Sequence, residues 1–292
     1  LDGVDVAKKE NNLIGSYASA DGLEPLDNYL KSWSESKTIP KNVWQAASYQ
    51  KAVYGVPWGA IPYVTLYNKK MFADAGVQPP KSWNEWHAIA KKLTNPSKGQ
   101  HAWAVRTDRL LTSFYKELLW ENGGGLFSNS MRGPGKIEAV ALENQRSIEA
   151  LDELVKRASY APGGLAGNVG LNGPDVVGLF AMGKIAMLHG AIHQYGQVLT
   201  LNPKMEGNIG AFLNPGNREK HTFVIGQTLV MTKKAQNKQL AWEYLKLSLS
   251  KKWETERCLR MGYAPFRMDI TEPKVLENPI ISVGMKGVEQ GI

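Results

Sequence analysis

Several features that define large classes of proteins are missing from this sequence of 292 residues. It has a single cysteine, Cys258, so it can form no internal disulfide, which fits a reducing compartment and equally an exported protein that avoids cysteine. No apolar run approaches the ~18 residues of a membrane-spanning helix. The sequence starts at Leu1 and shows no signal peptide, so we expect it to begin inside a longer gene product.

Motifs for common catalytic chemistries are also missing or incomplete. There is no Gly-x-Ser-x-Gly elbow, and residues 178–184 have phosphate-loop spacing but are followed by Ile185 instead of Ser or Thr. His189 and His193 are spaced like a helical zinc pair, yet Gly190 disfavours a helix and no third ligand is evident. We therefore expect no enzyme activity, no cofactor and no metal. A glycosidase stays open, because its two carboxylates can lie far apart in sequence.

The composition of the sequence is that of a folded protein of two domains with an excess of positive charge. It is 43% hydrophobic and 21% charged, and its length exceeds what one core usually takes, which favours two lobes. The net charge of +8 is scattered, mostly as pairs such as Lys91-Lys92, and no nucleic-acid-binding signature accompanies it. Nine tryptophans and eleven tyrosines suit core packing, and their faces also suit the C–H faces of sugars.

Strand-like and helix-like segments alternate along the chain, which predicts an α/β fold with largely parallel sheets. Ser82 and Glu85 form a capping box at the start of one helix. Residues 57–59 (Pro-Trp-Gly) predict a turn that holds Trp58 outward, before a strand ending at Asn68. The other expected elements are strands at 102–105, 184–188 and 223–231, the last broken at Gly226, and helices at 110–121, 137–157, 175–182, 237–250 and 252–260.

Five blocks of sequence occur in an order that is informative. They are Asp-Val near the start with Leu-Glu-Pro-Leu-Asp at 23–27, and then residues 54–86, 120–124, 180–187 and 241–245. Together they resemble the bacterial extracellular solute-binding proteins of ABC importers, in particular the sugar-binding family related to maltose-binding protein. The resemblance extends over nearly the whole chain.

This resemblance implies an α/β, two-lobed periplasmic-binding-protein-like (type II) fold with an interlobe ligand cleft and hinge strands. The strand–helix–strand portion that normally opens the family's first lobe is not among these residues, and the family usually adds more helix at the end. We therefore expect both lobes to be incomplete. The expected boundaries are 1–64 and 215–260 for lobe I and 65–214 and 261–292 for lobe II, with crossings near 64–68, 215 and 261–265.

The function implied by the resemblance is capture of a carbohydrate in the cleft and its delivery to the transmembrane subunits of an ABC permease. Hinge closure would follow from a higher ligand affinity of the closed form. The protein is expected to be a monomer without a nucleic-acid partner. Its expected location is outside the cytoplasm, either in the periplasm or as a lipoprotein on the cell exterior.

One departure from the family concerns the ligand. Many members carry Gly-Pro-Trp after the central strand, and the tryptophan stacks on a sugar ring, whereas residues 189–193 here read His-Gly-Ala-Ile-His. Either Trp58 or Tyr263 replaces that ring, or the ligand is not a typical oligosaccharide. Arg109 and Arg267 keep a phosphorylated polyol open, such as glycerol phosphate or its diester. A carbohydrate-active hydrolase and a pure interaction module are the alternatives of other classes.

Polar side chains of the site would bind hydroxyl groups, and aromatic side chains would stack. The ligand-binding residues that the aligned segments suggest are Asn11, Asn12, Trp58, Asp108, Arg109, Ser113, Gly190, His193, Gly226, Gln227, Tyr263 and Arg267.

Overall fold

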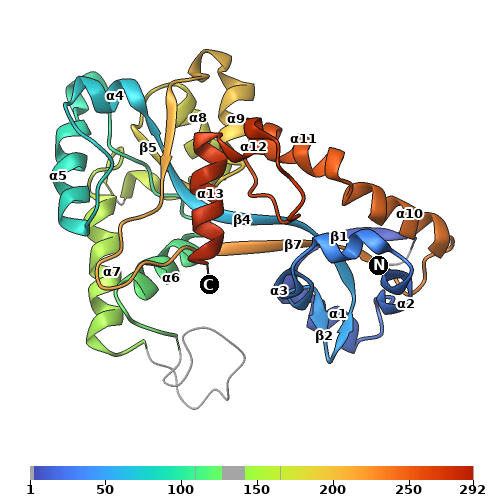
Figure 1. Ribbon diagram of the computed structural model, residues 1–292. Helices are drawn as coiled ribbons and strands as arrows, with labels where there is room; N and C mark the ends of the chain where they lie inside the picture. Colours follow the sequence, from blue (N-terminus) through green and yellow to red (C-terminus); the bar gives the residue numbers. More distant parts are fainter. Residues whose placement is uncertain (1–2, 109, 127–141, 165, 292) are drawn as a thin grey trace. The chain divides into compact units, whose positions relative to one another are not determined.

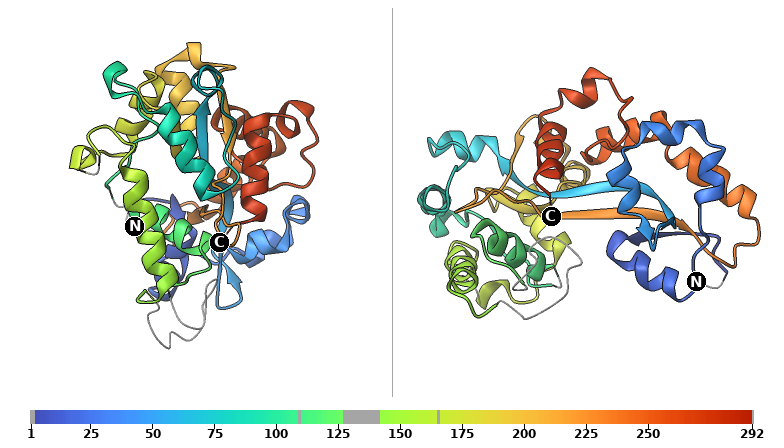
Figure 2. Two further views of the ribbon diagram at one scale, coloured as in Figure 1. Left: turned by 90° about the vertical axis from the view of Figure 1, so that its left-hand side faces the viewer. Right: turned by 60° about the horizontal axis from the view of Figure 1, so that its bottom comes forward.

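A computed structural model of the 292-residue chain describes residues 3–108, 110–126, 142–164 and 166–291. It divides into two compact units, each with its own core (Figures 1 and 2). Unit 1 combines Leu1–Ile61 with Val224–Met285, and unit 2 combines Pro62–Phe223 with Lys286–Ile292. Both units are therefore assembled from segments that are distant in the sequence.

This division differs from the expected lobe boundaries, above all for residues 261–285, which group with unit 1. The physical reason lies in Glu254, whose carboxylate accepts hydrogen bonds from the backbone N–H groups of Phe266 (2.6 Å) and Arg267 (3.1 Å). The chain after the helix that carries Glu254 thus folds back onto that helix. The unit boundaries fall at 61–62, 223–224 and 285–286, instead of near 64–68, 215 and 261–265.

Unit 1 is built on a sheet in which β1 (Val6–Glu10) pairs with β7 (Val224–Met231), and β7 is next to the first half of β4 (Gly55–Asn68). β1 and β7 are antiparallel, with Val6 opposite Met231. The helix α10 (Lys238–Ser248) packs on one face of this sheet, and the core there contains Val56, Leu229, Met231, Trp242 and Leu245.

Shorter elements complete unit 1. They are α1 (Ile14–Ser19), α2 (Asp27–Lys31), α3 (Lys41–Gln45), the hairpin of β2 (Ser48–Tyr49) and β3 (Ala52–Val53), α11 (Lys251–Met261), α12 (Pro273–Leu276), and the 3-10 helices η1 (Asn11–Leu13) and η2 (Ser34–Thr38). The helix α13 (Pro279–Glu289) starts in unit 1 and ends in unit 2.

In unit 2 the second half of β4 lies between β5 (Met187–Ala191) and β6 (Ile209–Phe212). Both neighbours are antiparallel to it, so that Thr65 stands opposite His189 on one side and Phe212 on the other. The helices are α4 (Lys69–Asp74), α5 (Trp83–Leu93), α6 (Leu111–Glu121), α7 (Gln145–Ala158), α8 (Gly173–Ala181) and α9 (Gln194–Leu201), with the 3-10 helices η3 (Pro96–Lys98), η4 (Ala166–Asn168) and η5 (Pro203–Met205).

The core of unit 2 lies between its helices and the sheet. α6 and α7 run side by side in both views (Figures 1 and 2). Their apolar side chains join those of α5 and β5 in one cluster. The cluster includes Phe72, Trp83, Trp86, Trp103, Phe114, Leu118, Leu154 and Met187.

The expectation of largely parallel sheets is wrong. The strand ladders whose register is defined among the described residues are all antiparallel. Parallel pairing occurs there only as isolated bridges, His101 with Ile185 and Thr222 with Gly291. An alternation of strands and helices predicts the order of elements along the chain, but it does not determine which strands become neighbours.

Four local predictions also need correction. Residues 57–59 lie inside β4 and form no turn, and residues 102–105 form no strand. β7 continues through Gly226 without a break. The helix expected at 137–157 begins at Gln145, where Asn144 caps it, and residues 142–144 are not helical. Residues 137–141 of that prediction lie outside the described part of the chain.

Candidate functional site

The candidate residues on and beside β7 lie on two faces of its sheet. Gly226 and Gln227 are consecutive in β7, so their side-chain directions are opposite. Asn11 lies on the Gly226 face, where its side-chain oxygen accepts a hydrogen bond from the Thr228 hydroxyl. A Cβ on Gly226 would lie 2.3 Å from the Asn11 amide nitrogen, so only glycine permits this approach. Asn12, in η1, is exposed. The structure therefore groups Asn11 with Gly226 and separates both from Gln227.

Trp58 is a half-buried strand residue whose ring already has neighbours. The buried ring of Tyr263 lies edge-on to it at 5.8 Å between centroids, and burial raises the pKa of Tyr263 to about 12. The Lys8 ammonium lies 4.6 Å from the centre of a Trp58 ring, and the Arg257 guanidinium lies 5.3 Å away. The Trp58 ring therefore already takes part in two cation–π contacts. The structure thus brings Trp58 and Tyr263 together, as a packed cluster.

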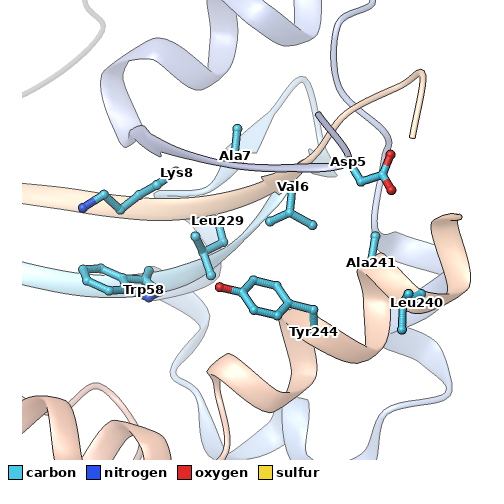
Figure 3. Close-up of a pocket in the computed structure, with 9 residues that line it drawn as sticks. All are labelled: Asp5, Val6, Ala7, Lys8, Trp58, Leu229, Leu240, Ala241 and Tyr244. Carbon is cyan, nitrogen blue, oxygen red and sulfur yellow. The ribbon is translucent and has the colours of Figure 1, made fainter. Parts of the chain in front are cut away.

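A surface hollow of about 710 Å³ adjoins Trp58 in unit 1 (Figure 3). Figure 3 shows the Tyr244 hydroxyl of α10 pointing toward Leu229 and Trp58. Among the described candidate residues, Trp58 alone contributes to its wall. The lining residues are Asp5, Val6, Ala7, Lys8, Trp58, Leu229, Leu240, Ala241 and Tyr244.

Arg267 is fully engaged inside unit 1. Its guanidinium donates to Asp269 through Nε (2.8 Å) and Nη2 (2.7 Å), and through Nη1 to Glu35 (2.9 Å) and the Leu249 carbonyl (2.8 Å). Only 4% of the residue is exposed. This arrangement argues against the expected role, because four of the five N–H donors of the guanidinium already bind groups of unit 1.

In unit 2 the structure describes four of the five candidate residues, since Arg109 lies outside the described ranges. Ser113 is buried in α6, and His193 directly precedes α9. A Cβ on Gly190 would lie 2.3 Å from the Gln194 side-chain oxygen, so this glycine permits close packing of β5 against α9. These three residues lie on different elements, and Asp108 has contacts of its own.

Asp108 is bound to a residue that the sequence gave no reason to select. Its Oδ1 accepts from Arg106 Nε (2.9 Å) and from the backbone N–H of Leu110 (3.0 Å), and its Oδ2 contacts Arg106 Nη2. The Arg106 hydrogen bond is the main reason why the pKa of Asp108 lies below its ordinary value. The signal in the sequence, Arg-x-Asp, is too common to single out without coordinates.

Arg106 lines a second, much smaller hollow, which lies within unit 2. Its volume is about 10 Å³, which is about the space for one water molecule. Its wall is mostly aromatic and apolar, with Arg106 and His189 as its basic members. The residues that form it are Tyr63, Trp103, Ala104, Val105, Arg106, Leu110, Leu111, Phe114 and His189.

His189 is held by a chain of buried polar groups that sequence reasoning missed. Its Nε2 lies 3.0 Å from a carboxylate oxygen of Glu117, and its Nδ1 lies 3.2 Å from the Thr65 hydroxyl. Thr65 in turn donates to Asn214 Oδ1 (3.0 Å). Burial raises the pKa of Glu117 well above its ordinary value and lowers the pKa of His189 to about 3. The His189 imidazole is therefore neutral, and burial favours the protonated form of the Glu117 carboxyl group beside it.

No group of three or more His, Cys, Asp or Glu side chains in the described part of the chain is arranged to hold a metal ion. No helix among the described residues combines the length and apolar character needed to cross a membrane.

Comparison with known proteins identifies relatives across most of the chain. A family model described as bacterial extracellular solute-binding protein matches residues 2–255. A diacetylchitobiose-binding protein of Streptomyces coelicolor is 27% identical over 275 residues, which is 89% of this chain and 60% of the relative. A binding protein of Brucella abortus is 23% identical over 248 residues, 83% of this chain and 57% of the relative. The chain thus spans less than two thirds of the length of these relatives.

Solved structures agree at the level of the fold. An ABC transporter solute-binding protein from Thermotoga lettingae, bound with α-D-tagatose, superimposes with a TM-score of 0.87 at 23% identity. That match covers 99% of this chain and 74% of the other. It confirms the predicted fold class at the level of a mixed α/β periplasmic-binding-protein fold.

Proposed function

Since the chain belongs to the family of bacterial extracellular solute-binding proteins, we propose that it is the substrate-binding component of an ABC importer whose ligand is a neutral carbohydrate or polyol. The observation that carries this proposal is the family match over residues 2–255. Proteins of this family bind a solute and do not transform it, which agrees with the expectation that the chain is not an enzyme.

A carbohydrate is supported by two relatives, which are described as binding diacetylchitobiose and α-D-tagatose. A neutral ligand is favoured over a phosphorylated one by the charges around the candidate residues. Arg106 is matched by Asp108, and Arg267 is matched by Asp269 and Glu35. A phosphate would have to compete with these carboxylates for the same guanidinium donors.

The cellular setting is proposed from the family alone. Delivery of the ligand to permease subunits, and a location outside the cytoplasm in the periplasm or on a lipoprotein, are what membership implies. The ligand cleft, the hinge closure and the remaining candidate residues stay predictions.

The test is a titration of the gene product, followed by tryptophan fluorescence and calorimetry. The panel comprises diacetylchitobiose, maltose, D-tagatose, ribitol and glycerol 3-phosphate. Saturable binding of a neutral member without turnover is the expected result. Preference for glycerol 3-phosphate would overturn the assignment of a neutral ligand. Formation of a product would establish an enzyme. Absence of binding by every member of the panel would refute a carbohydrate ligand.

A further inference from the structure

The guanidinium of Arg106 is held on two sides and retains a donor. Asp108 binds Nε and Nη2 along one edge. The flat face lies against Gly173 at the start of α8, where an added Cβ would be 2.9 Å from Nη2 and 3.3 Å from Cζ. Its remaining nitrogen, Nη1, has no hydrogen-bond partner among the described residues. Arg106 is thus fixed in place without having exhausted its hydrogen bonds.

Arg106 lines a hollow whose size limits the group that can bind there. With about 10 Å³ it has room for a group the size of a water molecule, such as one hydroxyl. Tyr63, Leu110 and Phe114 supply aromatic and apolar surface around it. His189, the other basic residue in the wall, has Glu117 at one ring nitrogen and Thr65 at the other.

Charge decides which kind of group fits. The Arg106–Asp108 pair is neutral overall, so the site offers no net attraction for a free anion. A hydroxyl oxygen can accept from Nη1 without displacing the carboxylate, whereas a phosphate or carboxylate would compete with Asp108 for the planar fork of the guanidinium.

We propose that Arg106 donates a hydrogen bond to a single hydroxyl group of the ligand, and that Asp108 is the residue that positions Arg106. This inference rests on the proposed function and makes it more specific. Arg106 would then select ligands that carry a hydroxyl group at one defined position. Asp108, which was expected to contact the ligand, would instead hold Arg106 in place.

The experiment compares wild type with Arg106→Met in binding diacetylchitobiose, maltose, D-tagatose and ribitol, and then the monodeoxy analogues of whichever binds. Loss of one hydrogen bond from a charged donor is expected to weaken binding of the parent sugar about 10- to 100-fold. Wild type should discriminate against one deoxy analogue by a similar factor, and Arg106→Met should lose discrimination at that hydroxyl only.

Further variants separate contact from support. Arg106→Lys keeps the charge but cannot hold Asp108 and the hydroxyl with the same fork, so binding should also fall. Asp108→Asn and Gly173→Ala should weaken binding by displacing the guanidinium. The matched control is Arg260→Met, because the Arg260 side chain is 80% exposed and pairs with Glu256 in unit 1.

Each outcome is decisive. Binding by wild type that is unchanged in Arg106→Met would overturn the inference and leave the proposed function intact. An equal loss for the parent sugar and all its analogues would show that Arg106 only maintains the fold, which also overturns it. If wild type binds none of the four probes, the proposed function fails on this panel, and the inference falls with it.

Discussion

At the scale of single residues, the buried chain from Glu117 through His189 and Thr65 to Asn214 shows how polar groups can lie in a core. His189 lies 3.0 Å from Glu117 and 3.2 Å from Thr65, and burial favours the uncharged forms of both ionisable groups, which reduces the cost of desolvation. The chain joins α6, β5 and β4, which are the elements that carry Phe114, His189 and Tyr63 to the small hollow of unit 2.

Thr65→Val should destabilise the protein by about 1–3 kcal/mol, because His189 Nδ1 and Asn214 Oδ1 would lose their partner in a buried setting. Urea unfolding at pH 7 measures the change. Thr65→Ser keeps the hydroxyl and should recover most of the loss. A valine variant as stable as wild type would mean that these contacts contribute nothing to folding.

Glu254 provides a pH dependence with a defined sign. Burial raises its pKa from 4.5 to about 7, although the Phe266 and Arg267 N–H groups oppose the shift. The folded state therefore retains a proton that the unfolded state releases between these values. The contribution of Glu254 to the free energy of unfolding is fully present below pH 4.5. It is lost as pH rises through 7, and the total loss is about 3 kcal/mol.

The measurement is unfolding free energy at pH 5 and pH 8 for wild type and Glu254→Gln. The free energy of unfolding of Glu254→Gln should rise relative to that of wild type as pH rises, because glutamine cannot ionise. Glu256→Gln, at a far more exposed position of the same helix, is the control and should track wild type. An identical pH profile for Glu254→Gln would refute the assignment.

Individual residues also show where sequence reasoning stops. Trp58 was identifiable as unusual, but its burial depends on Lys8, Arg257 and Tyr263, which are distant in sequence. The guanidinium of Arg267 could bind a phosphate, and only the coordinates reveal that it is hydrogen-bonded within unit 1. Arg106 gave no signal, since its position depends on Gly173, 67 residues later.

At the scale of elements, local signals in the sequence performed better. The cap of α5 is confirmed in its serine half: Ser82 Oγ accepts from the Glu85 N–H at 3.2 Å. The Glu85 carboxylate binds the backbone N–H of Lys81 (2.8 Å), one residue before the expected partner. The pairing of β4 with β5 and β6 could not be predicted from the sequence, because the residues of a strand do not determine which strand lies next to it.

Ser82→Ala should lower the unfolding free energy by about 1 kcal/mol, since the first turn of α5 loses its side-chain acceptor. Ser82→Asp keeps an acceptor and should remain near wild type. Denaturant unfolding of the three proteins is the measurement. Equal stability of alanine and serine would show that water replaces the cap without cost.

At the scale of the whole molecule, the family blocks predicted the fold class, and the expected boundaries differ from the two compact units where tertiary contacts of α11 matter. The two units differ in continuity. Unit 2 is one stretch, Pro62–Phe223, apart from Lys286–Ile292, whereas β1 and β7 of unit 1 are separated in the sequence by the whole of that stretch.

A fragment of residues 62–223 should therefore fold alone, since its core cluster lies within that stretch. Circular dichroism and a cooperative urea transition are the expected signs. The fragment 1–61 is the comparison and should stay unfolded, because β1 lacks the strand with which it pairs. An unfolded 62–223 fragment would show that the last seven residues or unit 1 are essential to it.

The pairing of Arg106 and Arg267 with carboxylates also has a consequence for the environment in which the protein works. The net charge of +8 is scattered along the sequence, and dissolved ions screen such charges over about 10 Å at 0.1 M salt. The affinity for a neutral sugar should hence be nearly the same in dilute and in concentrated salt. If the salinity around the protein fluctuates, the affinity for the solute should therefore stay constant.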